Sequence, residues 1–174
     1  MAAALAATFL SPRAVQAADV PWLLRDYIDR DLLSWVNAAP IVEAIEAQNL
    51  RHHGQAPPVI GARRAGLASL SLPLSDYLHA QVARSGGRIT KVTLIDAQGL
   101  AVAAGVLSSA QAPGDAVAFP QSLTAAPGAI LVDRVSFDDS TQSYRGQVTI
   151  AVVNPATGVA IGAITVGLQA VAFF

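Results

Sequence analysis

The sequence predicts an α+β fold in which a long N-terminal helix and a shorter helix pack against a five-stranded antiparallel sheet. Two observations lead to this prediction. Apolar residues recur at helical spacing in the first half of the chain, whereas from residue 89 onward they recur with a period of about two, as strands require. Short turn signals separate neighbouring strands, which therefore pair antiparallel. The 174 residues contain no internal repeat and no low-complexity linker, so we expect one folded domain.

The first seventeen residues have the pattern of a secretory leader. Residues 1–10 are almost wholly apolar, and Val15, Gln16 and Ala17 place small residues two apart, which signal peptidase accepts. No Lys or Arg precedes the apolar stretch, and Arg13 follows it. We predict a signal peptide over residues 1–17, a single domain over residues 18–174, and a periplasmic or secreted location. The alternative interpretation is an alanine-rich N-terminal helix.

Two helices are expected before residue 86. The first begins near Pro21 and continues to about Asn49, with Pro40 kinking or restarting it because proline lacks the backbone N–H of the preceding turn. Its apolar residues share one face: Leu24, Tyr27, Ile28, Leu32, Trp35 and Val36. The second helix covers residues 74–85, and Gly86 and Gly87 end it in a left-handed conformation.

Five strands are expected in the second half, at residues 89–96, 100–105, 130–137, 144–153 and 159–171. Residues 106–129 form a long crossing segment between the second and third strands. Residues 146–174 carry no charge, but the turn at 154–158 leaves an uninterrupted stretch shorter than the ~20 residues of a membrane span. We therefore predict a buried hairpin here and no transmembrane helix in the mature chain.

Composition argues against several classes of function. Eleven basic and twelve acidic residues leave a net charge of −1, which does not suit a nucleic-acid-binding surface. The absence of cysteine excludes disulfides, zinc–thiolate sites and a thiol nucleophile. The adjacent pair His52 and His53 has no third ligand nearby, so no metal site is expected. We find no enzyme signature and expect neither catalysis nor a cofactor.

Several stretches, in this order, resemble the Cache family of extracytoplasmic sensor domains, the PAS-like group also called PDC sensors. The resemblance covers residues 35–167 and rests on local stretches: 40–49 (PIVEAIEAQN), 73–78 (PLSDYL), 94–100 (LIDAQGL), 114–115 (GD), 133–144 (DRVSFDDSTQSY), 154–158 (NPATG) and 161–164 (IGAI). It implies a PAS-like sheet and a ligand held between that sheet and the loops at its edge. Residues 108–113 lack the aromatic residue that relatives carry before the Gly-Asp pair.

The resemblance also implies site residues. Asp138 matches an acidic residue that meets a ligand amine, and the other candidates for ligand binding are Asp115, Phe119, Phe137, Tyr144 and Asp133. Structural alternatives remain open for each. Asp138 also suits a β-turn, Asp115 a helix cap and the aromatic residues a core, while Asp133 and Arg134 alternate so that at most one faces inward.

The resemblance predicts a small-molecule sensing or binding domain without its own effector, acting through a separate membrane-bound signalling partner. An amine or amino acid is the favoured ligand class. The alternative is a structural or protein-interaction module that kept the fold and lost the ligand pocket. The apolar stripe of the first helix either pairs with a second copy of the chain or covers only its own sheet.

Overall fold

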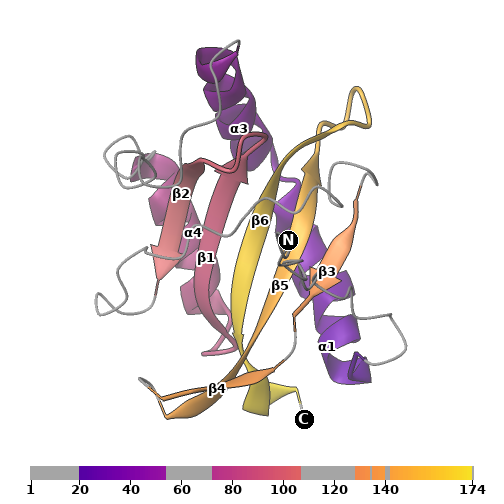
Figure 1. The fold of residues 1–174 in the computed structure, drawn as a ribbon, viewed down its shortest axis with the longest axis vertical. Helices are drawn as coiled ribbons and strands as arrows, with labels where there is room; N and C mark the ends of the chain where they lie inside the picture. Colours follow the sequence, from indigo (N-terminus) through magenta and orange to yellow (C-terminus); the bar gives the residue numbers. More distant parts are fainter. Residues whose placement is uncertain (1–19, 54–71, 107–127, 134, 140–141, 174) are drawn as a thin grey trace, which may run out of the picture.

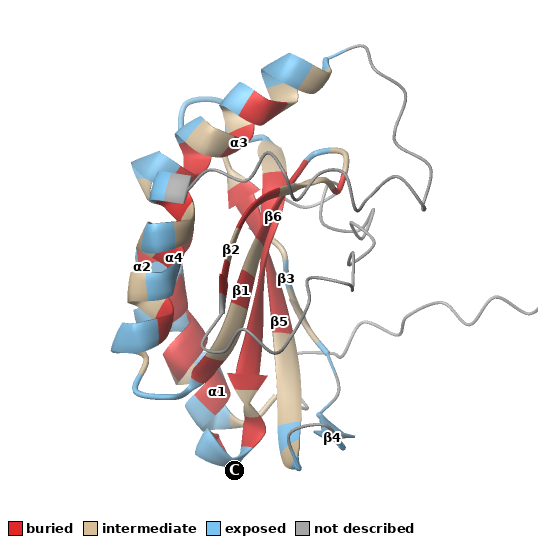
Figure 2. Ribbon diagram, turned by 90° about the vertical axis from the view of Figure 1, so that its left-hand side faces the viewer, coloured by how far each residue is buried: buried red, intermediate tan, exposed pale blue. Residues whose placement is uncertain are grey.

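The computed structural model describes residues 20–53, 72–106, 128–133, 135–139 and 142–173. These residues form two layers, with all the α-helices on one face of a single antiparallel sheet (Figures 1 and 2). The predicted signal peptide and residues 107–127 of the predicted crossing segment lie outside the described residues. None of the helices in the described ranges combines the length and apolar content that spanning a bilayer requires.

The sheet confirms the predicted α+β class and the PAS-like arrangement. Its strands are β1 (Ile89–Asp96), β2 (Ala101–Val106), β3 (Ile130–Val132), β4 (Ser136–Asp138), β5 (Ser143–Val153) and β6 (Ala160–Gln169). The order across the sheet is β2-β1-β6-β5-β3, and β4 pairs with β5 beyond β3. The last strand in the sequence, β6, therefore lies at the centre of the sheet, between β1 and β5.

The third predicted strand is wrong in one respect, because residues 130–137 do not form one strand. They form β3 and β4, which pair with different parts of β5: Val132 lies opposite Val148, and Ser136 lies opposite Arg145. Between these two pairs, β5 has two residues, Gly146 and Gln147. The segment that joins β3 to β4 has three, residues 133–135. The residue in excess cannot be paired, so the ladder is disrupted between β3 and β4.

The N-terminal helix is continuous to residue 36 and then restarts, as Pro40 predicted. Its parts are α1 (Trp22–Tyr27), the π-helical turn η2 (Ile28–Leu32), α2 (Leu33–Val36) and, after a break, α3 (Ala39–His52). Pro40 lies in the first turn of α3, where its missing N–H has no helical partner to lose. The helix begins next to Pro21, which is the N-cap residue of α1. The predicted stripe is buried throughout, from Leu24 to Val36.

The second helix, α4 (Leu72–Arg84), begins two residues earlier than predicted and ends at the predicted glycine pair. Gly86 and Gly87 have φ values of +63° and +85°, a region that glycine adopts without steric cost. The chain then enters β1, which lies beside the central strand β6. A short 3-10 turn, η4 (Ala170–Ala172), follows β6.

The main core lies between the helices and the sheet. Its largest fully buried side chains come from both layers: Leu32, Ile41, Ile45 and Leu78 from the helices, and Ile89, Leu94, Ile150, Ile164 and Leu168 from the strands. Because side chains alternate between the two faces of a strand, the residues between these strand positions point to the opposite face. We call that face, which the helices do not cover, the far face.

Candidate functional site

The far face is lined by small and polar side chains, in contrast to the large aliphatic residues of the helix-covered face. Its members on β1, β6 and β5 are, in that order, Lys91, Thr93 and Ile95; Ala163, Thr165 and Gly167; and Gln147, Thr149 and Ala151. Backbone pairing places these residues in three rows that run across the strands. The rows differ in chemistry, and together they form the candidate site.

The middle row consists of threonine hydroxyls. Thr165 of β6 lies opposite Thr93 of β1 on one side and opposite Thr149 of β5 on the other. The hydroxyl oxygens of Thr149 and Thr165 are 3.3 Å apart, and these two residues are only 4% and 2% exposed. A hydroxyl carries one donor and two acceptor positions, so the pair keeps hydrogen-bonding capacity after bonding to each other.

One side of this row is apolar. Ile95, Ala151 and Ala163 form a buried cluster that is separate from the main core, and Ala129, Leu131 and Ala160 pack against it. The side chains of the two alanines are smaller than the valines and isoleucines of the other face. This end of the far face is therefore an apolar surface of small side chains.

The other side of the threonine row is polar and charged. Gly167 lies opposite Lys91 on β1 and opposite Gln147 on β5. The side-chain amide of Gln147 donates to Oδ2 of Asp133 at 3.1 Å, and Asp133 is exposed. A positive and a negative side chain thus stand at the two ends of one row.

Two of the predicted site residues come together at the end of the sheet, but they are exposed. Phe137 and Tyr144 lie opposite each other on β4 and β5, with ring centroids 5.1 Å apart in an edge-to-face arrangement. Their exposed fractions are 47% and 54%, and Figure 1 shows β4 alongside the lower end of β5, at the bottom of the sheet. Neither aromatic residue belongs to the core, so the core alternative is wrong for this pair.

The remaining predicted site residues are only partly placed. Asp115 and Phe119 lie outside the described residues, as does the side chain of Asp138, whose backbone pairs with Ser143. Asp133 is at the polar end of the far face, bonded to Gln147. Their roles in ligand binding therefore stay predictions.

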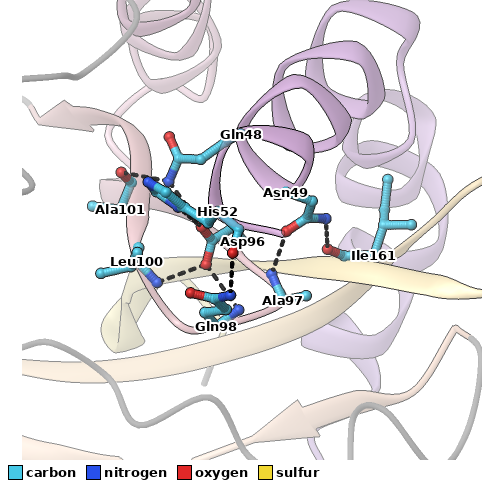
Figure 3. A network of polar contacts seen from close by, with 9 residues as sticks. All are labelled: Gln48, Asn49, His52, Asp96, Ala97, Gln98, Leu100, Ala101 and Ile161. Atoms are coloured by element: carbon cyan, nitrogen blue, oxygen red, sulfur yellow. Dashed lines mark hydrogen bonds and ion pairs between the residues drawn. The ribbon is translucent and has the colours of Figure 1, made fainter. Parts of the chain in front are cut away.

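A second polar cluster lies at the junction of α3 with the turn between β1 and β2 (Figure 3). Oδ1 of Asp96 accepts the backbone N–H groups of Gln98 and Leu100 at 2.9 and 2.8 Å, so this carboxylate holds its own hairpin turn. Its Oδ2 accepts the side-chain amide of Gln48 at 3.0 Å and lies 3.2 Å from Nδ1 of His52. These bonds fasten a helix to a hairpin, and we assign this cluster a structural role.

The described residues hold no group of three His, Cys, Asp or Glu side chains arranged for a metal ion. His52 faces Asp96, whereas His53 is exposed beyond the end of α3. The hydrogen-bonding groups of the far face are therefore the ones to consider for ligand recognition.

The interpretation of the sequence missed the threonine row. A signal for it was present, since in β5 and β6 the positions between large aliphatic residues hold Gln147, Thr149 and Ala151, and Ala163, Thr165 and Gly167. A strand buried against large side chains on both faces is aliphatic throughout. In β5 and β6, by contrast, the second face carries small and hydroxyl-bearing side chains.

Comparison with known proteins gives similarities in structure only. No protein-family model matches this sequence, and no curated protein sequence matches it either. The ligand-binding domain of the Campylobacter jejuni chemoreceptor Tlp3, solved with L-valine, is 16% identical and has a TM-score of 0.42; the match covers 87% of this chain and 63% of that domain.

Two further solved domains are similar to the same degree. The ligand-binding domain of the Pseudomonas aeruginosa amino acid chemoreceptor PctC, solved with GABA, is 16% identical with a TM-score of 0.42, covering 82% of this chain and 61% of that one. The ligand-binding domain of the Pseudomonas fluorescens chemoreceptor CtaA, solved with L-serine, is 14% identical with a TM-score of 0.40, covering 86% and 60%.

This chain thus spans about three fifths of the length of the solved domains that it matches. Since every TM-score is below 0.5, the assignment of the fold rests on this chain's own strand order, β2-β1-β6-β5-β3. That order, preceded by a broken N-terminal helix and a shorter second helix, is the PAS-like arrangement that the Cache resemblance implied.

Proposed function

We propose that this chain is an extracytoplasmic, non-enzymatic sensor domain of the Cache type that binds a small organic molecule on the far face of its sheet. In this proposal, the bound state is passed to a separate membrane-bound signalling partner. Amino acids are the first ligand class to test, since they are the class bound by the solved domains to which this chain is similar.

The observation that supports this proposal best is the buried threonine pair at the centre of the far face. Thr149 and Thr165 are in the middle of a sheet whose helices are all on the other side, and Thr165 is flanked along its strand by the small residues Ala163 and Gly167. Ligand sites are mostly apolar surfaces with a few fixed polar groups, which is the composition found here.

The proposal is tested by thermal unfolding of the protein in the presence of L-valine, L-isoleucine, L-serine, GABA and simple carboxylates and amines. A ligand that binds only the folded state adds about 2.7 kcal/mol at 100 times its dissociation constant. For a domain of this size, that free energy raises the midpoint temperature by about 5 to 10 °C. We expect at least one compound to produce such a rise.

Replacing the hydroxyl pair provides the matched test. Thr165→Val keeps the shape of the side chain and removes the hydroxyl that faces Thr149, so it is expected to reduce the ligand-induced rise while the unliganded protein stays folded. Thr157→Val, in the exposed turn between β5 and β6, is the control. A flat response across the whole panel would contradict the proposal and favour the interaction module that lost its ligand pocket.

The homodimer through the first helix also stays a proposal. The predicted stripe itself is buried, but Trp22, Leu23 and Leu33, which lie outside it on α1 and α2, support the proposal because they are 74%, 40% and 37% exposed. Sedimentation equilibrium of the protein decides between a dimer and a helix that covers only its own sheet.

A further inference from the structure

The polar end of the far face contains a β-bulge that brings two side chains over one glycine. Ile89 lies opposite Leu168 and Lys91 lies opposite Gly167, so Thr90 is an extra residue in β1. A Cβ atom placed on Gly167 would be 2.9 Å from Oγ1 of Thr90 and 2.8 Å from Cγ of Lys91. Both side chains therefore lie across the space that Gly167 leaves empty.

Lys91 is the only lysine in the sequence, and its ammonium group is available. Its Cε is 3.4 Å from the position of a Gly167 Cβ, so the aliphatic stem runs along the sheet toward β6. Within the described part of the chain, Arg30 pairs with Asp26 and His52 with Asp96, and Lys91 takes part in neither ion pair. An ammonium group held over the sheet without a carboxylate partner is a ready site for an anion.

The hydroxyl of Thr90 gives an independent indication. Its Oγ1 is inaccessible to solvent and has no hydrogen-bond partner. Buried side-chain hydroxyls without a partner are uncommon in folded proteins. This hydroxyl and the stem of Lys91 lie next to each other, since Oγ1 of Thr90 and Cγ of Lys91 are 2.9 and 2.8 Å from the same position, that of a Cβ atom on Gly167.

We propose that Lys91 and Thr90 bind the carboxylate of the ligand, and that the rest of the ligand extends over the threonine row toward Ile95, Ala151 and Ala163. This inference rests on the proposed function and names its ligand class: a small organic carboxylate with an apolar body, amino acids included. Lys91 and Ile95 are four residues apart in one strand, a separation of about 13 Å, which accommodates such a molecule lying along the strands.

The acidic residue in the same row does not oppose this assignment. Asp133 is three strands away from Lys91, about 14 Å between backbones, and its carboxylate accepts a hydrogen bond from Gln147. Charges separated by more than about 10 Å in salt solution are largely screened from each other. Asp133 is, however, available to the amine of a longer zwitterionic ligand.

The single lysine makes the test direct. Reductive ¹³C-methylation labels Lys91 and the chain's N-terminus while preserving their charge, and the Lys91 methyl resonance is then followed by NMR during titration. Isovalerate and octanoate serve as probes, and their neutral amides, isovaleramide and octanamide, are the matched controls. We expect the carboxylates to shift the Lys91 resonance in a saturable manner, and the amides to leave it in place.

Variants of the unlabelled protein provide the second measurement. Lys91→Met retains the stem and removes the charge, and we expect it to weaken carboxylate binding about tenfold or more in calorimetry, with Lys91→Arg restoring part of the affinity. Thr90→Val, which removes only the hydroxyl, is expected to weaken binding less. Arg84→Met removes the same charge from an exposed position on α4 and is expected to have no effect.

The outcomes separate this inference from the proposed function. If compounds stabilise the protein but neutral amides bind as well as carboxylates, or Lys91→Met binds as tightly as the original protein, the carboxylate site is wrong and the sensor proposal stands. If no compound of either panel binds, both fall. Saturable binding of the carboxylates that depends on both Lys91 and Thr90 supports both.

Discussion

A single carboxylate, that of Asp96, holds together two segments that are far apart in the sequence. Asp96 is fully buried and accepts two backbone N–H groups of its own turn as well as the side-chain amide of Gln48 on α3. Gln48 is itself only 2% exposed, and its amide also donates to the carbonyl oxygen of Ala101 at 3.2 Å. If the carboxylate were lost, the two N–H groups of the turn would lose these bonds and the Gln48 amide would keep only the carbonyl oxygen of Ala101.

We therefore expect Asp96→Ala to lower the free energy of unfolding by about 3 kcal/mol or more, because it removes charge-assisted hydrogen bonds and leaves buried donors unpaired. Urea denaturation of the variant and the original protein measures this difference. Asp76→Ala, at an exposed position of α4, is the control and is expected to change stability by less than about 0.5 kcal/mol. Equal stability losses in the two variants would contradict the structural role assigned to Asp96.

At the scale of elements, the contact between α4 and β2 depends on a glycine. A Cβ atom on Gly105 would be 2.9 Å from both the backbone nitrogen of His79 and the backbone carbonyl carbon of Leu78. These are main-chain atoms of a helix, which cannot rotate away as a flexible side chain can. Only a residue without a side chain allows α4 to lie this close to β2.

Gly105→Ala is accordingly expected to destabilise the protein by about 1 to 3 kcal/mol, the usual cost of overpacking. Gly146→Ala in β5 is a matched control, because a Cβ there would meet only a side-chain carbon of Val135, at 3.6 Å, an ordinary contact distance. Thermal unfolding of both variants makes the comparison. A Gly105→Ala variant as stable as Gly146→Ala would show that α4 shifts freely on the sheet.

For the molecule as a whole, helical and strand periodicity predicted most of the architecture from the sequence. The apolar stripe from Leu24 to Val36 and the glycine pair after α4 lie where they were expected. Both can be recognised in a short stretch of sequence, because a buried helix face shows apolar residues at helical spacing and positive φ favours glycine. The break between β3 and β4 depends on how two strands pair with a third, and no local pattern records that. The bulge at Thr90 and the space that Gly167 leaves beside it likewise depend on the pairing of β1 with β6.

The two ends of the described chain meet around Tyr27. Its ring lies 5.2 Å from that of Phe173, centroid to centroid, and the guanidinium of Arg88, just before β1, is 5.6 Å from the centre of the Tyr27 ring. Burial, with a smaller contribution from the carboxylate of Asp31, raises the pKa of Tyr27 above 10.0, while Arg88 acts in the opposite direction. The neutral phenol is therefore favoured in the folded state more than in the unfolded chain.

This closure predicts how stability depends on alkaline pH. A group whose pKa is raised on folding contributes stability that is complete below its unfolded pKa and is lost as the pH rises through the folded one. We expect stability to fall above pH 10 as unfolded Tyr27 ionises, and Tyr27→Phe to make this fall shallower because phenylalanine keeps the ring contacts and has no proton to lose. Urea midpoints measured between pH 8 and pH 11.5 test it. Tyr144→Phe, whose ring is half-exposed, is the control, and an alkaline profile for Tyr27→Phe identical to that of the original protein would show that the contact between the chain ends does not depend on a neutral phenol.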